Sequence, residues 1–274
     1  MPGTRLPGPR PRKALGQHFL RDTGVLLDIA RAVRVPEGGV VLEIGPGTGQ
    51  LTEFLLAEGF PVVALEIEER MIAHLQRRFR DDERLRVVAG DARLFEPSDA
   101  IPPGVPYVVA GNLPYFAANP IIRHLLEAER KPEEMVVMVQ REVGREICAP
   151  EGDWSLLTIS VQVYAATESL FDVAPEAFDP PPSVVSTVVR MTLRPEPLVA
   201  PERNAALFEF VSKVFRNPRK QIHNGLRRSG FVPPDRAHEA LTTAGIESSR
   251  RPETLTIPEW LRLMDACEQA RAGG

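Results

Sequence analysis

The sequence predicts an α/β fold, in which a doubly wound, mainly parallel seven-stranded sheet precedes a small all-α domain. Short apolar runs alternate with helical patterns along the first half of the chain, and this order gives parallel strands with helices on both faces. After residue 201 only helical patterns remain. A length of 274 residues, with 43% hydrophobic and 26% charged residues, suits one large and one small globular domain.

Each predicted element has its own signal. A helix should begin near Asp22, because an apolar face with helical spacing follows it. Asn119 can cap a later helix with Pro120 at its first position, and Thr256 with Glu259 has the form of a capping box. Further helical patterns cover 51–56, 71–79 and 207–215, and the predicted strands are 40–44, 61–67, 85–89, 107–110, 135–139, 156–164 and 184–193.

Three domains follow from this reading: a flexible basic tail (1–14), a large α/β domain (15–200) and a helical domain (201–274). The net charge is −4, but basic residues gather near both ends of the chain. Local charge decides what a surface attracts, so we expect the helical domain to bind RNA phosphates. The expected RNA-binding residues are Arg216, Arg219, Lys220, Arg227 and Arg228, although any single one of them can also be an ordinary solvated side chain.

Composition also excludes several classes of protein. No apolar run approaches the roughly 18 residues that span a bilayer, and prolines replace the apolar core of a signal peptide. The two cysteines, Cys148 and Cys267, have neither a disulfide pattern nor zinc-site spacing. We therefore expect a cytoplasmic protein with no membrane contact and no metal.

The strongest motif is a glycine-rich loop between a predicted strand and a helix. It reads Glu-Ile-Gly-Pro-Gly-Thr-Gly over residues 43–49, with glycines at 45, 47 and 49. A dinucleotide-binding loop would instead read G-x-G-x-x-G. The observed spacing favours S-adenosylmethionine, because its sulfonium group brings no phosphate for the helix N-terminus to hold.

Acidic residues end the next two predicted strands. Glu66 lies 21 residues after Gly45, where a carboxylate can accept hydrogen bonds from ribose hydroxyls. Asp91 follows the third strand and can accept a hydrogen bond from the adenine amino group of the cofactor. Either residue alone would more often be a solvated strand end, but three such features at successive strand ends favour a cofactor site.

The fourth predicted strand ends in Asn112-Leu113-Pro114-Tyr115, which is the candidate catalytic motif. The amide oxygen of Asn112 and the carbonyl oxygen of Leu113 can each accept one hydrogen of a planar NH2 group. Such acceptors favour a pyramidal nitrogen whose lone pair points at the methyl donor. Pro114 fixes the backbone, and Tyr115 offers a face on which a base can stack.

Phe178 is a second aromatic candidate, in a stiff proline-rich segment. A base taken out of its stack is usually held between two flat groups, so Phe178 can cover the other face of the target. Core packing explains this segment almost as well.

Together these motifs resemble the bacterial branch of the KsgA (RsmA) family of ribosomal RNA adenine N6,N6-dimethyltransferases. The resemblance covers nearly the whole chain, and its most discriminating part is Leu-Gly-Gln-His-Phe-Leu at 15–20. It also includes the motifs at 43–49, 66, 90–91, 112–115, 178–186 and the basic run 215–226. Many relatives have lysine where this chain has Ser183.

The resemblance implies a Rossmann-like class I methyltransferase that forms S-adenosylhomocysteine as its product. Its substrate would be two adjacent adenosines in a hairpin loop near the 3′ end of 16S rRNA, in the immature 30S subunit, and the protein would be a monomer. The catalytic group would be Asn112, Leu113, Pro114, Tyr115 and Phe178. The cofactor would contact His18, Leu20, Gly45, Gly47, Glu66, Ile67, Asp91, Ala92 and Asn112.

Three other functions remain open from the sequence. A macrolide-resistance methyltransferase acting on large-subunit rRNA shares the core motifs. An NAD-dependent oxidoreductase is opposed by the glycine spacing and by the motif at 112–115. A mainly non-catalytic ribosome assembly factor with this fold is opposed by the same intact motif.

Overall fold

The computed structural model describes residues 9, 17–216 and 220–272. The predicted basic tail, apart from Pro9, and the predicted RNA-binding residue Arg219 therefore lie outside the described residues. Contacts divide the chain into two units. Unit 1 comprises Met1–Arg145 and Ala166–Leu193, and unit 2 comprises Glu146–Ala165 and Arg194–Gly274.

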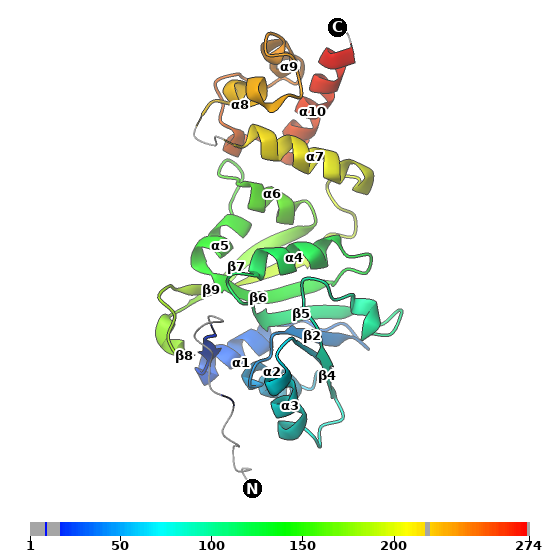
Figure 1. The fold of residues 1–274 in the computed structure, drawn as a ribbon, viewed down its shortest axis with the longest axis vertical. Helices are drawn as coiled ribbons and strands as arrows, with labels where there is room; N and C mark the ends of the chain where they lie inside the picture. The colour runs from blue at the N-terminus through cyan, green and yellow to red at the C-terminus, as the bar shows by residue number, and fades with distance from the viewer. Residues whose placement is uncertain (1–8, 10–16, 217–219, 273–274) are drawn as a thin grey trace. The chain divides into compact units, whose positions relative to one another are not determined.

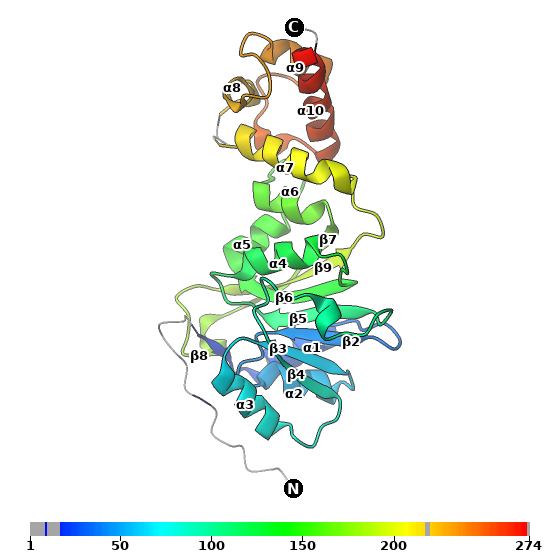
Figure 2. The same ribbon diagram turned by 45° about the vertical axis from the view of Figure 1, so that its right-hand side comes forward.

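Unit 1 is built on a seven-stranded sheet with the order β4-β3-β2-β5-β6-β9-β7 (Figures 1 and 2). Its strands are β2 (Val40–Ile44), β3 (Val62–Glu66), β4 (Leu85–Ala89), β5 (Tyr107–Asn112), β6 (Glu134–Gln140), β7 (Ala165–Val173) and β9 (Ser186–Leu193). The five strands from β4 to β6 pair in parallel, and β9 runs antiparallel to β6. The predicted doubly wound, mainly parallel seven-stranded sheet is thus confirmed.

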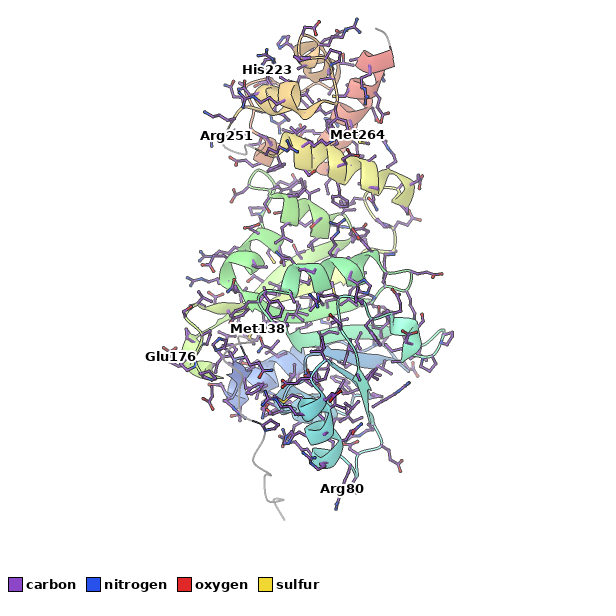
Figure 3. The ribbon with its side chains drawn as sticks, viewed as in Figure 1. Arg80, Met138, Glu176, His223, Arg251 and Met264 are labelled. Atoms are coloured by element: carbon purple, nitrogen blue, oxygen red, sulfur yellow. The ribbon has the colours of Figure 1, made fainter. Side chains whose placement is uncertain are left out.

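Helices alternate with strands, as the pattern predicts, although the first helix precedes β2 and only a 3₁₀ helix lies between β4 and β5. They are α1 (Thr23–Ala32), α2 (Gln50–Ala57), α3 (Glu69–Arg78), α4 (Ala118–Glu127) and α5 (Arg141–Ile147). Apolar side chains of α1 and α2, among them Leu26 and Leu55, form one core cluster with Val41 and Ala64 of the sheet. Met138 of β6, labelled in Figure 3, belongs to the same cluster and is only 1% exposed. Alternate strand residues point to the opposite face.

Chain order changes direction at β2, which has β3 on one side and β5 on the other. Loops that leave these two strands must diverge, so a crevice forms at the carboxyl ends of the strands. The glycine-rich loop follows β2, and the motif that begins at Asn112 follows β5. The topology therefore brings the two strongest sequence motifs to the same edge of the sheet.

Two short strands lie outside this sheet. β1 (Phe19–Leu20) pairs antiparallel with β8 (Phe178–Asp179), and Leu20 is opposite Phe178. The main-chain NH of Arg21 donates to the carbonyl of Ala177 at 2.7 Å and extends the pairing. The segment that precedes α1 is thereby fixed beside the proline-rich segment.

One predicted strand is wrong. Residues 156–164 begin with a helix, α6 (Leu156–Gln162), and the missing strand is β7 instead. Ser155 caps α6, because its hydroxyl accepts from the main-chain NH of Thr158 and the Thr158 hydroxyl accepts from the main-chain NH of Ser155. The β-branched residues of this segment suggested a strand, but the capping box and burial on one side outweigh that local preference.

The predicted cap at Asn119 is also wrong. Helix α4 begins two residues earlier than predicted, at Ala118, with Ala117 at the N-cap position and no side-chain cap. The main-chain NH of Ala117 donates to the carbonyl of Pro114 at 2.8 Å, and this turn starts the helix early. The helix predicted to begin near Asp22 is confirmed, and the structure adds that Asp22 caps it, since its carboxylate accepts from the main-chain NH of Val25 at 3.0 Å.

Unit 2 is helical, as predicted for the C-terminal part. With α6 it contains α7 (Pro201–Val214), α8 (Ile222–Ser229), α9 (Ala237–Thr243) and α10 (Ile257–Ala272). Of the 3₁₀ helices in the described residues, Pro252–Thr254 also belongs to this unit, whereas Pro97–Asp99 and Pro175–Ala177 belong to unit 1.

The core of unit 2 is aromatic. Trp260 and Phe210 are fully buried and pack edge to face, with ring centroids 6.0 Å apart. Residues 146–165 fall inside the predicted large domain, but their contacts join them to these helices.

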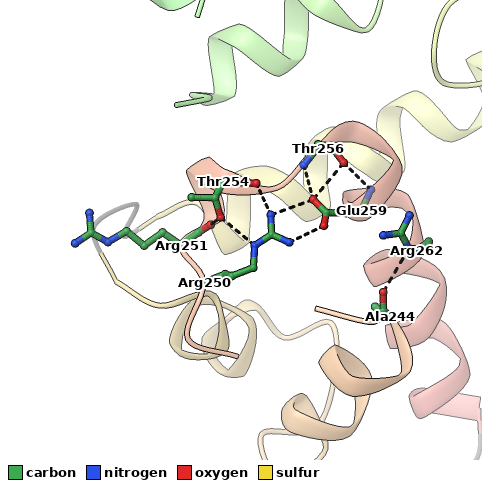
Figure 4. Close-up of polar contacts among 7 residues, drawn as sticks. All are labelled: Ala244, Arg250, Arg251, Thr254, Thr256, Glu259 and Arg262. Carbon is green, nitrogen blue, oxygen red and sulfur yellow. Dashed lines mark hydrogen bonds and ion pairs between the residues drawn. The ribbon is translucent and has the colours of Figure 1, made fainter. Parts of the chain in front are cut away.

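The predicted capping box at the start of α10 is confirmed (Figure 4). Glu259 accepts from the main-chain NH of Thr256 at 2.9 Å and donates its own NH to the Thr256 hydroxyl at 3.4 Å. The guanidinium of Arg250 donates to both Glu259 carboxylate oxygens, at 2.5 and 3.1 Å. These bonds lower the pKa of Glu259, so its carboxylate stays charged at the helix N-terminus.

Candidate active site

A pocket of about 300 Å³ lies at the carboxyl ends of the parallel strands of unit 1. It is lined by residues from the ends of β2, β3 and β5, from the turn after β4 and from the segment before α1. Among its lining are eleven predicted site residues: His18, Gly45, Gly47, Glu66, Ile67, Asp91, Ala92, Asn112, Leu113, Pro114 and Tyr115. The fold therefore gathers side chains from five separate motifs into one cavity.

The glycine-rich loop adopts a backbone conformation that only glycine takes readily. Gly45 and Gly47 have φ values of 64° and 57°. No atom lies within 4 Å of the place where a Cβ of Gly45 would stand, so a side chain there would project into the pocket. A Cβ on Gly47 would lie 3.0 Å from the ring of Phe19. The glycines thus leave the main chain open to a ligand.

Glu66, at the end of β3, binds the glycine-rich loop through its carboxylate. One carboxylate oxygen accepts from the main-chain NH groups of Ile67 and Glu68, both at 2.9 Å, and the other accepts from that of Gly47 at 3.1 Å. Burial raises the pKa of Glu66, and these three hydrogen bonds oppose the rise because they favour the charged form. One lone pair of the second oxygen remains for a ligand hydroxyl.

Glu43, at the end of β2, is a second buried carboxyl but does not line the pocket. The Thr52 hydroxyl donates to it at 2.6 Å and joins β2 to α2. Burial raises the pKa of Glu43 to about 7, and the nearby charge of Glu66 adds to the rise. This residue belongs to the support of the glycine loop rather than to the ligand surface.

Asp91 lies in the turn after β4. Its two oxygens accept from the guanidinium of Arg93, with 2.5 Å between Oδ2 and one terminal nitrogen. These hydrogen bonds lower the pKa of Asp91, which keeps it charged. The expected hydrogen bond to an adenine amino group would therefore compete with Arg93, which also lines the pocket.

Asn112 is oriented by the segment that precedes α1. Its Nδ2 donates to the main-chain carbonyl of His18 at 3.3 Å. With the NH2 end used in this way, the amide oxygen is the end available to accept a hydrogen bond from a substrate. This is the orientation that an acceptor for an NH2 group requires.

Tyr115 is held on two sides. Its hydroxyl lies 2.7 Å from the hydroxyl of Ser186, a fully buried residue at the start of β9. Its ring stacks against His18, with centroids 6.3 Å apart and an interplanar angle of 24°. The Nδ1 atom of His18 donates to the carbonyl of Pro180 at 2.7 Å, since a carbonyl can only accept. Two neighbouring segments thereby limit the rotation of the tyrosine ring.

Two predicted site residues are not among those that line the pocket. Phe178 is 4% exposed and Leu20 is 6% exposed, and both belong to the core cluster of the sheet. They pair across β1 and β8. In this structure both side chains pack in the core, as the alternative interpretation of Phe178 expects, and their contacts with a ligand stay predictions.

Several residues that line the pocket were not predicted from the sequence. Among them, Phe19 is buried and Arg93 binds Asp91, whereas Phe116 is 72% exposed. Phe116 directly follows the catalytic motif, and this position was the only signal that could have identified it. Ile67, which was predicted, is also exposed and adds apolar surface at the pocket.

The predicted RNA-binding residues belong to unit 2. Arg216, Lys220, Arg227 and Arg228 are exposed, and the last two lie in the final turn of α8. Arg219 lies outside the described residues. No group of three His, Cys, Asp or Glu side chains gathers as metal ligands would, and no helix has the length and hydropathy to cross a membrane, over the part of the chain that the structure describes.

The pocket has the chemistry that S-adenosylmethionine requires. The open glycine loop leaves room beside the main chain, Glu66 offers a carboxylate to hydroxyl groups, and Ile67 offers apolar surface to a flat ring. Its volume of about 300 Å³ lies at the lower end of the range of ligand pockets. The residues present therefore fit the cofactor that the glycine spacing predicts.

Comparisons with known proteins show the family of this chain. The model of the family described as ribosomal RNA adenine dimethylase matches residues 9–269. The chain is 39% identical to ribosomal RNA small subunit methyltransferase A of Pseudomonas aeruginosa, over 93% of both chains. It is 38% identical to the protein of the same name from Dehalococcoides mccartyi, over 93% of this chain and 87% of that one.

Solved structures share the fold. The crystal structure of the 23S rRNA methyltransferase ErmE matches with a TM-score of 0.70 and 28% identity. The match covers 92% of this chain and 100% of the ErmE chain. A dimethyladenosine transferase from Plasmodium falciparum has a TM-score of 0.78 and 24% identity, over 93% of this chain and 98% of that one, and shows the fold alone. With the family model matching almost the whole chain, this protein belongs to the ribosomal RNA adenine dimethylase family.

Proposed function

We propose that this protein transfers methyl groups from S-adenosylmethionine to N6 of two adjacent adenosines near the 3′ end of small-subunit rRNA, and forms N6,N6-dimethyladenosine. The observation that carries the proposal is the orientation of Asn112, whose NH2 group is bound by His18 and whose oxygen is left for the substrate. Membership of the family and the printed name of its bacterial relatives support the choice of rRNA.

The bound cofactor supplies an electrophilic methyl group. Glu66 and the glycine loop would hold its ribose and its amino acid part, with Ile67 and Ala92 beside the adenine and S-adenosylhomocysteine left as product. His18, which also lines the pocket, would contact the cofactor as well.

The chain's own residues prepare the nitrogen of the target. The Asn112 amide oxygen and the Leu113 carbonyl accept the two N6 hydrogens in the first transfer, and one of them accepts the remaining hydrogen in the second, which draws the lone pair out of conjugation with the ring. After each transfer the methylated nitrogen is cationic and acidic, and it loses one proton to water. Leu113 is fixed by a hydrogen bond from its main-chain NH to the carbonyl of Met138 at 3.1 Å, so its own carbonyl has a set direction. The face of Tyr115 holds the base, and the held geometry removes much of the entropic barrier.

The helical unit would bind the rRNA. Its exposed residues Arg216, Lys220, Arg227 and Arg228 would contact rRNA phosphates in the immature 30S subunit. Arg219 would join them, although it lies outside the described residues. We expect the protein to act in the cytoplasm, as a monomer and without a metal.

Mass spectrometry of rRNA from a strain that lacks the gene tests this function. The deletion should remove N6,N6-dimethyladenosine from small-subunit rRNA, and the wild-type gene should restore it. In vitro, the purified protein should methylate precursor small subunits and not precursor large subunits. Methylation of the large subunit alone would instead support the macrolide-resistance activity, and dimethyladenosine that persists in the deletion strain would contradict the proposal.

A further inference from the structure

Phe116 combines two properties that the proposed reaction leaves unexplained. It lines the pocket directly after the catalytic motif, and yet its side chain is 72% exposed. It is the one aromatic residue among the large hydrophobic side chains that are exposed in the described residues. A single exposed phenylalanine needs no explanation elsewhere on a surface, but this one lines the pocket beside the exposed side chain of Ile67, where it is placed to contact a ligand.

The backbone of Phe116 is held in place although its side chain is exposed. Phe116 lies within the turn that is closed by the hydrogen bond from the Ala117 NH to the Pro114 carbonyl. The buried side chains of Ala117 and Ala118 then hold the start of α4 in place. The aromatic ring therefore projects from a fixed point. A ring carried on a fixed backbone loses less entropy on binding than one on a mobile loop.

The other aromatic candidates have other tasks. Phe178 is buried in the core cluster, and Tyr115 is bound by Ser186 and His18 at the place assigned to the target base. Consecutive Cα atoms lie about 3.8 Å apart, so a base next to the target is within reach of the residue after Tyr115. Every base has a flat face, and stacking on an aromatic side chain suits single-stranded RNA.

We propose that Phe116 is a stacking platform for the nucleobase adjacent to the adenine being methylated. This inference rests on the proposed function, because it assumes that the target base occupies the pocket beside Tyr115. The ring faces one side of the target, so it would stack on the partner adenosine while one member of the pair is methylated, and a purine has the larger stacking surface. Phe116 would thus favour a pair of adenosines over an adenosine beside a pyrimidine.

The first test couples a protein change to an RNA change. Precursor small subunits are prepared with the natural adenosine pair or with one adenosine replaced by uridine, and methylation of the remaining adenosine is measured for the wild type and Phe116→Ala. On the natural pair, Phe116→Ala should lower kcat/KM by about 5- to 140-fold, which corresponds to the removal of one base stack. Phe116→Tyr should stay near wild type.

The RNA change should then matter only when the ring is present. Replacing the neighbour by uridine should slow the wild type and add little to the defect of Phe116→Ala. Leu94→Ala is the matched control, because Leu94 is 77% exposed and is not among the residues that line the pocket. A Phe116→Ala variant as active as Leu94→Ala, or two effects that simply multiply, would overturn the proposal.

A second readout does not depend on activity. In Phe116→Trp, the fluorescence of the new indole should be quenched by an oligoribonucleotide hairpin that carries the adenosine pair. An abasic nucleotide in place of either one of the adenosines should reduce that quenching, and equal quenching by all the hairpins would overturn the stacking assignment. If the wild type fails to methylate small subunits, the proposed function fails, whereas the fluorescence comparison still decides the role of Phe116.

Discussion

Replacing Glu66 by glutamine should weaken cofactor binding by an amount that the hydrogen bonds predict. The Glu66 carboxylate accepts three main-chain NH groups, two on one oxygen and one on the other. A glutamine amide has a single acceptor oxygen, so at least one of these donors faces an NH2 group instead. The best arrangement keeps Ile67 and Glu68 bound and leaves the NH of Gly47 unpaired.

The hydrogen bonds lost in Glu66→Gln determine how much the Kd for the cofactor product should rise. An unpaired buried donor costs about 1–3 kcal/mol and loosens the glycine loop in the free protein. A ribose hydroxyl also loses a hydrogen bond to a charged carboxylate, worth about 1.5–3 kcal/mol. The second loss applies directly to the complex, so the Kd for S-adenosylhomocysteine should rise by about 10- to 150-fold.

Isothermal titration calorimetry with S-adenosylhomocysteine measures this change without turnover. Glu43→Gln is the matched control, because Glu43 is also a buried carboxyl at a strand end but bonds to Thr52 and does not line the pocket. Its Kd should change by less than about threefold, which is under 0.7 kcal/mol. Equal Kd values for wild type and Glu66→Gln, or a larger effect from Glu43→Gln, would refute the assignment of Glu66.

Three further predictions concern other parts of the molecule. Ser186→Ala should lower kcat without changing the Kd for cofactor, because it removes the 2.7 Å hydrogen bond that holds the ring of Tyr115, and it should have little further effect in a Tyr115→Phe background. Because burial raises the pKa of Glu43 to about 7, the folded state binds more protons than the unfolded state above pH 4.5. That stabilisation is present below pH 4.5 and is lost as the pH rises through 7, by up to about 3 kcal/mol, so urea unfolding of the wild type should depend on pH more steeply than that of Glu43→Gln. Changing both Arg227 and Arg228 to glutamine should weaken rRNA binding and reduce the salt slope by about 0.7–0.9 for each phosphate that the protein no longer neutralises.

Each of these predictions has a contradicting result. Independent effects of Ser186→Ala and Tyr115→Phe would show that their hydrogen bond does not position the ring. The same pH dependence of unfolding in wild type and Glu43→Gln would show that Glu43 does not titrate in this range. An unchanged salt slope after substitution of Arg227 and Arg228 would remove the end of α8 from the RNA interface.

Local sequence patterns predicted the parallel half of the sheet well. Strands β2, β3, β5 and β6 are short apolar runs that are largely buried on both faces, and such runs are hard to mistake for other elements. Strand β4, at the edge of the sheet, is only partly buried but keeps three apolar residues in a row. The edge strand β7 was harder to predict. Strand β7 has exposed charged residues, and the β-branched segment at α6 imitates a strand, so only the capping box of Ser155 and contacts distant in sequence decide between them.

The candidate site was predictable where its residues follow strands. Parallel strands bring their carboxyl ends to one edge, so the glycine loop, Glu66, Asp91 and Asn112 had to converge. The orientation of single side chains was not predictable. Nothing in the sequence distinguishes the buried ring of Phe178 from the exposed ring of Phe116, because each depends on pairing or turns formed by distant residues.

The role of Asn112 is the central claim, and methylation of precursor small subunits by wild type and Asn112→Ala tests it most directly. N6,N6-dimethyladenosine is measured by mass spectrometry, and binding of the same subunits is measured in parallel. The wild type should form the dimethylated product, and Asn112→Ala should bind the subunits and form none. Product formation by Asn112→Ala at the wild-type rate would contradict the assignment of the amide oxygen to the target NH2 group.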